Sequence, residues 1–258
     1  MALFYLLFLA LICTSNAQSA DPTSDFCNIT SKINSPRVSA NIDNLLAELV
    51  STINTQDGFT IVSKGENEDQ VYGLAQCRGD IISKDCLTCI QDASKEIRKR
   101  CPDQSDARIW YDYCFLRYDN KKFFGQSYTS FGIILYNLRN VTEPDVFNKE
   151  LGTSIDKIRS EALNKKAFAT GKSKISNFIN LYALVQCTRD LSQLSCAQCL
   201  AAAIANFPRV CKDKEGCQVL YSSCYVRYEI YPFFFPLDPQ EKLVKRSMKD
   251  YSSLVLRP

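Results

Sequence analysis

Apolar residues recur along this chain at two spacings, one typical of amphipathic helices and one typical of strands. Residues 41–54 and 146–164 carry Leu, Ile and Val at helical spacing, and two further helices are predicted over residues 83–100 and 192–208. Runs rich in Tyr, Val, Ile and Phe predict strands. These runs are residues 59–63, 71–77, 108–118 and 218–231. In each half, two helices packed on an antiparallel sheet, an α+β arrangement, is the simplest packing.

The two halves of the chain are copies of one another. An offset of 110 residues places five cysteines of the first half on five of the second without a gap. The superimposed pairs are Cys77 and Cys187, Cys86 and Cys196, Cys89 and Cys199, Cys101 and Cys211, and Cys114 and Cys224. Because about 110 residues is a usual size for one domain with its own core, two tandem domains are predicted. They cover residues 18–135 and 146–240, with a connector at 136–145 and a tail at 241–258.

The chain begins with a pattern that indicates export. Residues 2–13 form an unbroken apolar run, and the small-residue pattern that ends at Ala17 is typical of a signal-peptidase site. Residues 1–17 are therefore predicted to be a signal peptide, because the run is too short to span a membrane and no later segment is longer. Of the thirteen cysteines, Cys13 leaves with the signal, and the remaining twelve are expected to pair in an oxidising compartment.

Charge and composition argue against several functions. The net charge of +3 is spread along the chain without a long basic block, so nucleic-acid binding gains little support. The sequence contains no histidine, which removes the commonest general base and excludes Ser-His-Asp and Cys-His sites. Asp103 and Asp106 fall in a polar turn and are predicted to be solvated charges. We expect no catalytic residue, no cofactor and no metal.

The cysteine spacing resembles that of a known family. The segments CRGDIISKDCLTC (residues 77–89) and CTRDLSQLSCAQC (residues 187–199) share the spacing C-x8-C-x2-C. This repeated spacing resembles the plant ginkbilobin-homologous domain, also called the salt-stress-response/antifungal domain. Two such domains after a signal peptide are similar to plant cysteine-rich repeat secretory proteins. The resemblance implies a secreted, non-enzymatic protein of the apoplast, associated with stress or with defence against fungi.

The same resemblance implies a disulfide pattern. Carried over, it pairs Cys27 with Cys101, Cys77 with Cys86, Cys89 with Cys114, Cys187 with Cys196, and Cys199 with Cys224. The second repeat has no counterpart of Cys27, which leaves Cys211 for Cys217. The two cysteines of each CxxC pair then have different partners, so structural disulfides are favoured over thiol redox chemistry or zinc binding.

A carbohydrate site is a further implication of the resemblance. The ginkbilobin-type domain is similar to a small lectin that holds mannose with an Asn, an Arg and a Glu; here these positions are Asn28, Arg108 and Asp119. Amide, guanidinium and carboxylate groups suit sugar hydroxyls. A straight strand would separate Arg108 from Asp119 by roughly 36 Å, so the chain must reverse near Asp112 and Tyr113. The second repeat has Gln218 and Glu229 instead, and its site is predicted to be lost.

Two observations keep another function open. Asn28 and Asn140 both begin glycosylation sequons, and a glycan on Asn28 would occupy the proposed sugar site. The aromatic residues of 110–115 and 231–236 belong either to the core or to an interdomain or partner surface. The alternative to binding of mannose-containing glycans is thus a module that binds apoplastic or cell-surface proteins without sugar.

Overall fold

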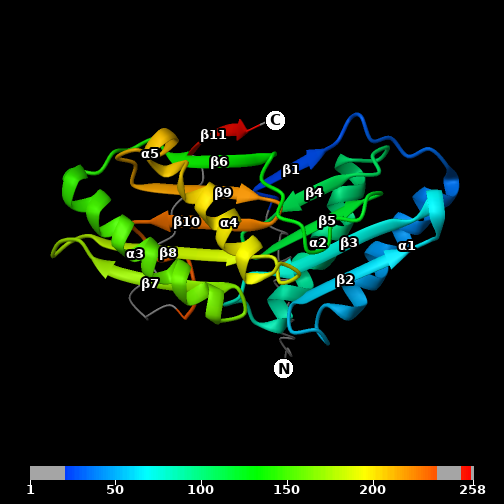
Figure 1. Cartoon of the computed structure of the whole chain (residues 1–258), viewed down its shortest axis with the longest axis horizontal. Helices are drawn as coiled ribbons and strands as arrows, with labels where there is room; N and C mark the ends of the chain where they lie inside the picture. Colours follow the sequence, from blue (N-terminus) through cyan, green and yellow to red (C-terminus); the bar gives the residue numbers. More distant parts are fainter. Residues whose placement is uncertain (1–20, 237–250, 257–258) are drawn as a thin grey trace, which may run out of the picture.

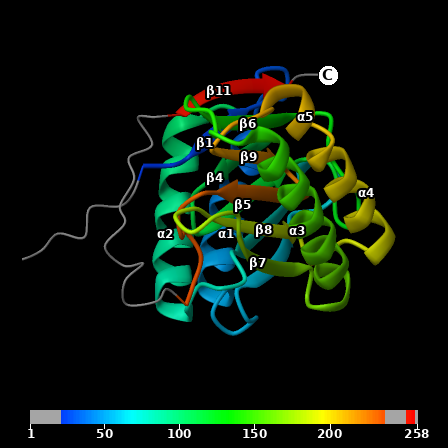
Figure 2. The ribbon, with the colours of Figure 1, turned by 90° about the vertical axis from the view of Figure 1, so that its left-hand side faces the viewer.

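Two antiparallel sheets form the centre of the molecule. The computed structural model describes residues 21–236 and 251–256, so the predicted signal peptide and residues 241–250 of the predicted tail lie outside the described residues. The sheets lie side by side along the long axis (Figure 1). Seen along that axis, α1 (Pro36–Thr52) and α2 (Ser83–Arg100) lie on one side, and α3 (Pro144–Asn164) and α4 (Gln193–Ile204) lie on the other (Figure 2). The predicted α+β class is confirmed.

The first sheet has five strands in the order β1-β4-β5-β3-β2. Its strands are β1 (Ser24–Cys27), β2 (Phe59–Lys64), β3 (Val71–Cys77), β4 (Ala107–Trp110) and β5 (Cys114–Asp119), with a short 3-10 helix, η1 (Asn67–Asp69), before β3. Helix α1 begins five residues earlier than predicted, because the Ser35 side chain accepts a hydrogen bond from the Val38 backbone N–H and Pro36 occupies the first turn.

The second sheet has six strands in the order β11-β6-β9-β10-β8-β7. They are β6 (Gly132–Asn137), β7 (Phe168–Lys174), β8 (Asn180–Cys187), β9 (Gly216–Tyr221), β10 (Cys224–Glu229) and β11 (Tyr251–Leu256). The single helix predicted over 192–208 is divided into α4 and the short α5 (Phe207–Val210). A proline is tolerated in the first turn of a helix but not in its interior, so Pro208 marks a new start.

Both long strand predictions correspond to hairpins. The run 108–118 contains β4 and β5, which pair antiparallel after the chain reverses at residues 111–113, as the sugar-site hypothesis requires. The run 218–231 contains β9 and β10. Five strands were not predicted, β1, β6, β7, β8 and β11. The β7 sequence FATGKSK is mostly polar, and β7 lies at a sheet edge where one face and one side are solvated.

The boundary between the residues of the two sheets lies earlier in the sequence than the predicted connector at 136–145. Strand β6 pairs with β9 and with β11, so residues 132–135 belong to the second sheet and not to the first domain. The predicted tail also contributes to that sheet, through β11. Sequence patterns did not reveal this, because the residues of β6 do not indicate which strand β6 pairs with. That pairing decides the domain to which the strand belongs.

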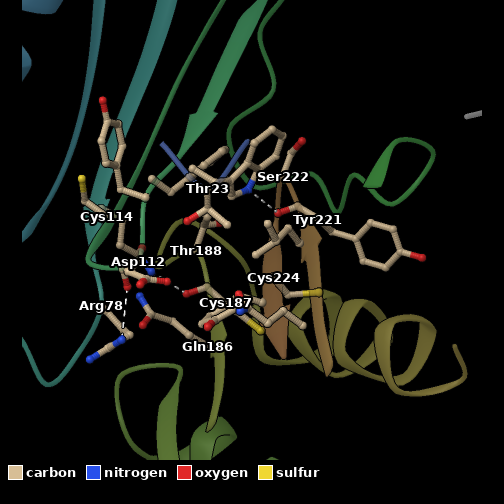
Figure 3. A pocket seen from close by; sticks show the side chains of 17 residues that line it. Thr23, Arg78, Asp112, Cys114, Gln186, Cys187, Thr188, Tyr221, Ser222 and Cys224 are labelled. Carbon is tan, nitrogen blue, oxygen red and sulfur yellow. Dashed lines mark hydrogen bonds between the residues drawn. The ribbon is translucent and has the colours of Figure 1, made fainter. Parts of the chain in front are cut away.

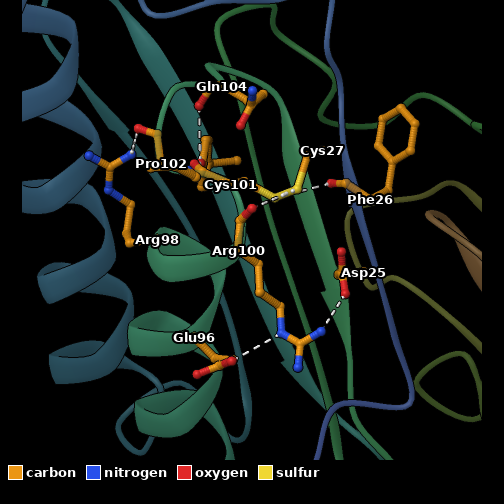
Figure 4. The surroundings of a disulfide bond; sticks show 10 residues. Asp25, Phe26, Cys27, Glu96, Arg98, Arg100, Cys101, Pro102 and Gln104 are labelled. Atoms are coloured by element: carbon orange, nitrogen blue, oxygen red, sulfur yellow. Dashed lines mark hydrogen bonds and ion pairs between the residues drawn. A yellow bond between two sulfur atoms is a disulfide. The ribbon is translucent and has the colours of Figure 1, made fainter.

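Six disulfides stabilise the two domains, each bond within one domain, in the pairs that the family resemblance implies. Figure 4 shows the bond between Cys27 and Cys101, which joins the end of β1 to the end of α2. Beside it, the Arg100 guanidinium contacts the Asp25 carboxylate of β1 at 2.9 Å. The edge strand of the first sheet is therefore held to a helix by a covalent bond and an ion pair.

Each sheet has its own core beneath its helices, and a third cluster joins them. Buried apolar side chains from α1, α2 and the first sheet form one core, and those from α3, α4 and the second sheet form another. The third cluster contains Trp110 and Phe131 with Ile133, Leu135 and Leu220 from the second sheet. Trp110, an aromatic whose environment the sequence left open, thus packs between the domains. No helix in the described part of the chain is long and apolar enough to cross a membrane.

Candidate functional site

The three predicted sugar-binding residues lie on the face of the first sheet that the helices leave uncovered. Asn28 follows the last residue of β1, Arg108 lies on β4 and Asp119 ends β5. In the ladder, Arg108 is opposite Phe26 of β1 and opposite Arg117 of β5, so these side chains share one face. The structure therefore brings the three predicted residues to one region, with other charged groups between them.

Asn28 is held by its surroundings. Its Nδ2 donates a hydrogen bond to Asp106 Oδ2 at 3.0 Å, and its Oδ1 accepts from the backbone N–H and the hydroxyl of Thr30. Asp106, predicted to be a solvated charge, is only 5 % exposed, whereas Asp103 is exposed. The interpretation of Asp106 was wrong, because the Asn28 amide donates a hydrogen bond to its carboxylate and the Arg108 guanidinium pairs with its charge.

Arg108 is one of the largest fully buried side chains in the described chain, with 1 % of its surface exposed. Its Nη2 lies 3.3 Å from both carboxylate oxygens of Asp106, and its Nη1 donates to Ser222 Oγ of the second domain at 3.0 Å. The guanidinium also lies over the ring of Phe26 and, at 4.3 Å from the centroid, over that of Tyr128. Arg108 is thus buried among residues of both domains.

Asp119 is buried in an ion pair of its own. Arg117 Nη2 donates to Asp119 Oδ2 at 2.7 Å, and the backbone N–H of Lys121 donates to Oδ1. Burial raises the pKa of Asp119, and the nearby Asp106 adds to that effect, while Arg117 opposes it. Burial, with the like charge of Arg108, lowers the pKa of Arg117. This part of the sheet is a packed network of two cations and two carboxylates.

Sequence reasoning missed Asp106 and Arg117 as members of this network, although a signal was present. Opposite charges stand two residues apart in the segments DAR, RYD and RYE, at residues 106–108, 117–119 and 227–229. Because side chains two apart on a strand point to the same face, such pairs can form buried ion pairs. The third pair, Arg227 and Glu229, has an Nε to Oε1 distance of 2.9 Å.

The second domain uses its corresponding face differently. Gln218 replaces Arg108, and its Nε2 is buried without a hydrogen-bond partner in the described structure. Arg227 extends across the domain boundary and donates to Asp112 Oδ1 at 3.3 Å, with Phe233 packed against its guanidinium. The face of the second domain is therefore tied to the turn between β4 and β5 of the first.

The two domains contact each other with twofold reciprocity. Gln76 Nε2 donates to the Cys187 carbonyl at 2.8 Å, and Gln186 Nε2 donates to the Cys77 carbonyl at 2.9 Å. Each glutamine is the counterpart of the other at the 110-residue offset, and so are the two cysteines. The same residue thus makes the same bond in both directions, which is the property of an isologous interface.

The remaining oxygen of each glutamine repeats the pattern. Gln76 Oε1 accepts from the Arg189 backbone N–H at 2.9 Å, and Gln186 Oε1 accepts from the Gly79 backbone N–H at 3.0 Å. Arg189 and Gly79 also stand 110 residues apart. Both side-chain amides are consequently satisfied by the other domain, so they hold the two sheets in one relative orientation.

The loops that follow β5 and β10 add a second reciprocal pair of hydrogen bonds. The Gly125 N–H donates to Asp190 Oδ2 at 2.7 Å, and the Phe235 N–H donates to Asp80 Oδ2 at 2.7 Å. Glycine 125 has φ of +76°, a conformation that favours glycine. Each domain therefore holds a loop of the other through a backbone N–H at an equivalent position.

A cavity remains between the domains beside these contacts (Figure 3). Its volume is about 60 Å³. Trp110, Phe115, Leu220 and Tyr225 form much of its wall, and Thr188 and Ser222 contribute hydroxyls. A buried water needs roughly 10–15 Å³ on this measure, so the cavity has room for a few waters and not for a sugar ring.

The described residues show no arrangement for a metal ion or for thiol chemistry. No group of three or more His, Cys, Asp or Glu in the described part of the chain is placed to hold a metal. All twelve cysteines of the described ranges are in disulfides, those of the two CxxC pairs included. A redox reaction at CxxC would need a thiolate, which these cysteines do not supply in this state.

This fold is a tandem pair of disulfide-stapled α+β domains, and comparison with known proteins identifies its family. The family described as salt stress response/antifungal matches residues 13–121 and 136–231. The chain therefore belongs to the salt stress response/antifungal family, as the cysteine spacing predicted.

Two relatives match most of the chain along most of their own length. The chain is 55 % identical over 240 residues to cysteine-rich repeat secretory protein 55 of Arabidopsis thaliana, with 90 % of each chain covered. It is 41 % identical over 216 residues to an antimicrobial ginkbilobin-2-like protein of Castanea crenata, covering 83 % of this chain and 89 % of that one. Both relatives support the resemblance that the sequence carried.

A solved structure has the same two-domain fold. The tandem DUF26 ectodomain of the Arabidopsis thaliana cysteine-rich receptor-like protein PDLP8 superimposes with a TM-score of 0.69 at 26 % identity. The match covers 81 % of this chain and 97 % of that one. Because nearly the whole of that ectodomain is matched at once, the likeness extends beyond a single domain.

Proposed function

We propose that this protein is a non-enzymatic recognition protein of the plant apoplast, active in stress or antifungal defence. It binds a protein partner through the outer surface of a fixed two-domain unit. The family description and the relatives named secretory and antimicrobial support the location and the process. A sequence without histidine and with its described cysteines in disulfides supports a role in binding instead of catalysis.

The burial of Arg108 is the observation that favours a protein partner over mannose. A sugar at Asn28, Arg108 and Asp119 would have to displace Tyr128 from the guanidinium and compete with Asp106 and Arg117 for their charged partners. Breaking a buried ion pair costs about 3–5 kcal/mol, which a sugar bound here would have to offset. We therefore infer that the three residues stabilise the face of the first sheet and that Arg108 also binds the second domain.

Calorimetric titration with methyl α-mannoside tests this proposal. The mature protein, produced with its disulfides formed in a host that attaches no N-glycans, is expected to give no saturable heat up to millimolar sugar, and an Asp119→Asn variant should behave in the same way. Saturable binding by the wild type that Asp119→Asn removes, with all disulfides and the circular dichroism spectrum unchanged, would show that the sugar-site hypothesis is right and this proposal wrong.

Glycan occupancy supplies an independent check. Asn140 and Thr142 of the second sequon are exposed, whereas Asn28 is half-buried and bonded to Asp106. Both sequons stay predictions, and peptide mapping of protein secreted from plant cells measures each. High occupancy at Asn28 would exclude sugar binding there, because the attached glycan fills the same space. An unoccupied Asn28 leaves the titration to decide.

A further inference from the structure

The outer edge of β6 carries a strand that lies outside the family's shared domain. Residues Tyr251–Leu256 form β11, which pairs antiparallel with β6 from Tyr251 opposite Asn137 to Leu256 opposite Gly132. The family match ends at residue 231. Figure 1 shows β11 alongside β6, at the outer edge of the second sheet. The C-terminal strand is thus an addition to the sheet that the family defines.

Comparison with the first sheet shows which attachment β11 replaces in the second. Strand β1 pairs with β4 as β6 pairs with β9, and β4 and β9 are counterparts in the repeat. The Cys27–Cys101 bond fastens β1, but the second domain has no cysteine in the place of Cys27, and its Cys211 is bonded locally to Cys217. Strand β6 is instead held between β9 and β11. The ladder to β11 therefore does noncovalently what a disulfide does in the first domain.

The attachment of β11 is mostly a backbone ladder. Leu254 is 41 % exposed and Val255 is 45 % exposed, so these side chains bury little apolar surface. Leu256, in contrast, packs against the second core, although its side chain is only partly buried. Contacts of β11 with elements other than β6 are few. A ladder of this kind depends on the strand's backbone and not on the chain to which the strand belongs.

The connection to β11 is long enough to serve two molecules. Fourteen residues, 237–250, separate Pro236 from Tyr251. An extended segment of that length spans up to about 50 Å, so the strand of one molecule can reach the β6 edge of a neighbour. Exchange of an identical element keeps every contact of the original ladder, which makes it a low-cost route to a twofold dimer.

We propose that the β6 edge is a strand-docking site, and that its ligand besides β11 of the same molecule is the Tyr251–Leu256 strand of a second copy of this chain. The recognised chemistry is an extended segment whose N–H and C=O groups continue the sheet in antiparallel register. The chain's own strand covers the site until it is exchanged.

A labelled peptide tests the site in the intact mature protein. The probe is a fluorescein-labelled peptide of residues 249–258, and binding is followed by fluorescence anisotropy. The double variant Ser253→Pro, Leu254→Pro removes two neighbouring N–H groups of β11, one of which must face β6 because neighbours alternate across an antiparallel ladder. The matched control Ser253→Ala, Leu254→Ala keeps both N–H groups and so keeps the edge covered.

The proposal predicts saturable binding of the peptide to the proline variant, at least tenfold tighter than to the wild type or to the alanine control. A scrambled peptide of the same composition should not bind. The proposal is overturned if the proline variant, with its circular dichroism and six disulfides intact, binds the peptide no better than the wild type. It is also overturned if the scrambled peptide binds equally, since the edge would then accept any strand and not this chain's own.

Discussion

Buried arginines on the uncovered sheet faces are paired by the geometry of a strand. Arg108, Arg117 and Arg227 each bond a carboxylate two residues away, on the same strand for Arg117 and Arg227 and directly before the strand for Arg108. An aromatic ring lies over each guanidinium. The close carboxylate and the ring compensate for lost hydration, so a charge can remain inside at these positions. Arg108 and Asp119, which resemble residues of a sugar site, belong to this network.

Substitution of Asp106 should show the structural role of the network. In Asp106→Asn the Arg108 guanidinium stays buried without a charged partner of its own, and the free energy of unfolding should fall by about 2–4 kcal/mol. Asp103→Asn is the matched control, because Asp103 lies three residues away and is exposed; it should change stability by less than about 0.5 kcal/mol. Urea unfolding followed by tryptophan fluorescence measures both, and equal effects would mean that Asp106 is solvated after all.

At the residue scale, the sequence predicts which kinds of side chain gather in one region better than it predicts whether each of them is buried. The reversal near Asp112 and Tyr113 follows from the sugar-site hypothesis, and the structure has it. The burial of Asp106 does not follow, because it depends on Tyr128 in a later loop and on Ser222 of the other domain, which fix Arg108 beside it. Contacts between residues 20 and 114 positions apart leave no trace in a local pattern of charges.

At the element scale, the two domains fasten their first strands by different means. In the first domain, a disulfide that closes 74 residues of sequence holds β1 to α2. In the second, the corresponding bond closes only 6 residues and leaves β6 to its neighbours. The helices and the long strand runs could be predicted from apolar spacing. Strands β6 and β11 could not be placed, since each is defined by its pairing partner.

The two domain-specific disulfides should contribute unequally to stability. On the chain-entropy model the longer loop contributes about 4.5 kcal/mol and the shorter about 2.4 kcal/mol. The double variant Cys27→Ala, Cys101→Ala should therefore lose about twice as much free energy of unfolding as Cys211→Ala, Cys217→Ala. Urea unfolding of both at one temperature makes the comparison; a larger loss from the short loop would contradict the assignment of the long loop as the main staple.

At the scale of the whole molecule, duplication accounts for the interface as well as for the domains. The offset of 110 residues predicts two copies, and the structure adds that counterparts bond to counterparts, Gln76 with the strand of Gln186 and the reverse. A repeat in a sequence carries no record of how its copies face each other. Reciprocal bonds and the shared cluster around Trp110 make the pair one unit with a single outer surface.

Differential scanning calorimetry of the mature chain tests this central claim most directly. If the reciprocal glutamine bonds and the cluster around Trp110 hold the domains as one unit, both should unfold in one transition, with a calorimetric enthalpy close to the van't Hoff enthalpy. A Gln76→Ala, Gln186→Ala variant should broaden that transition. Two separate transitions in the wild type, or a calorimetric enthalpy near twice the van't Hoff value, would show that the domains unfold independently and would contradict the account.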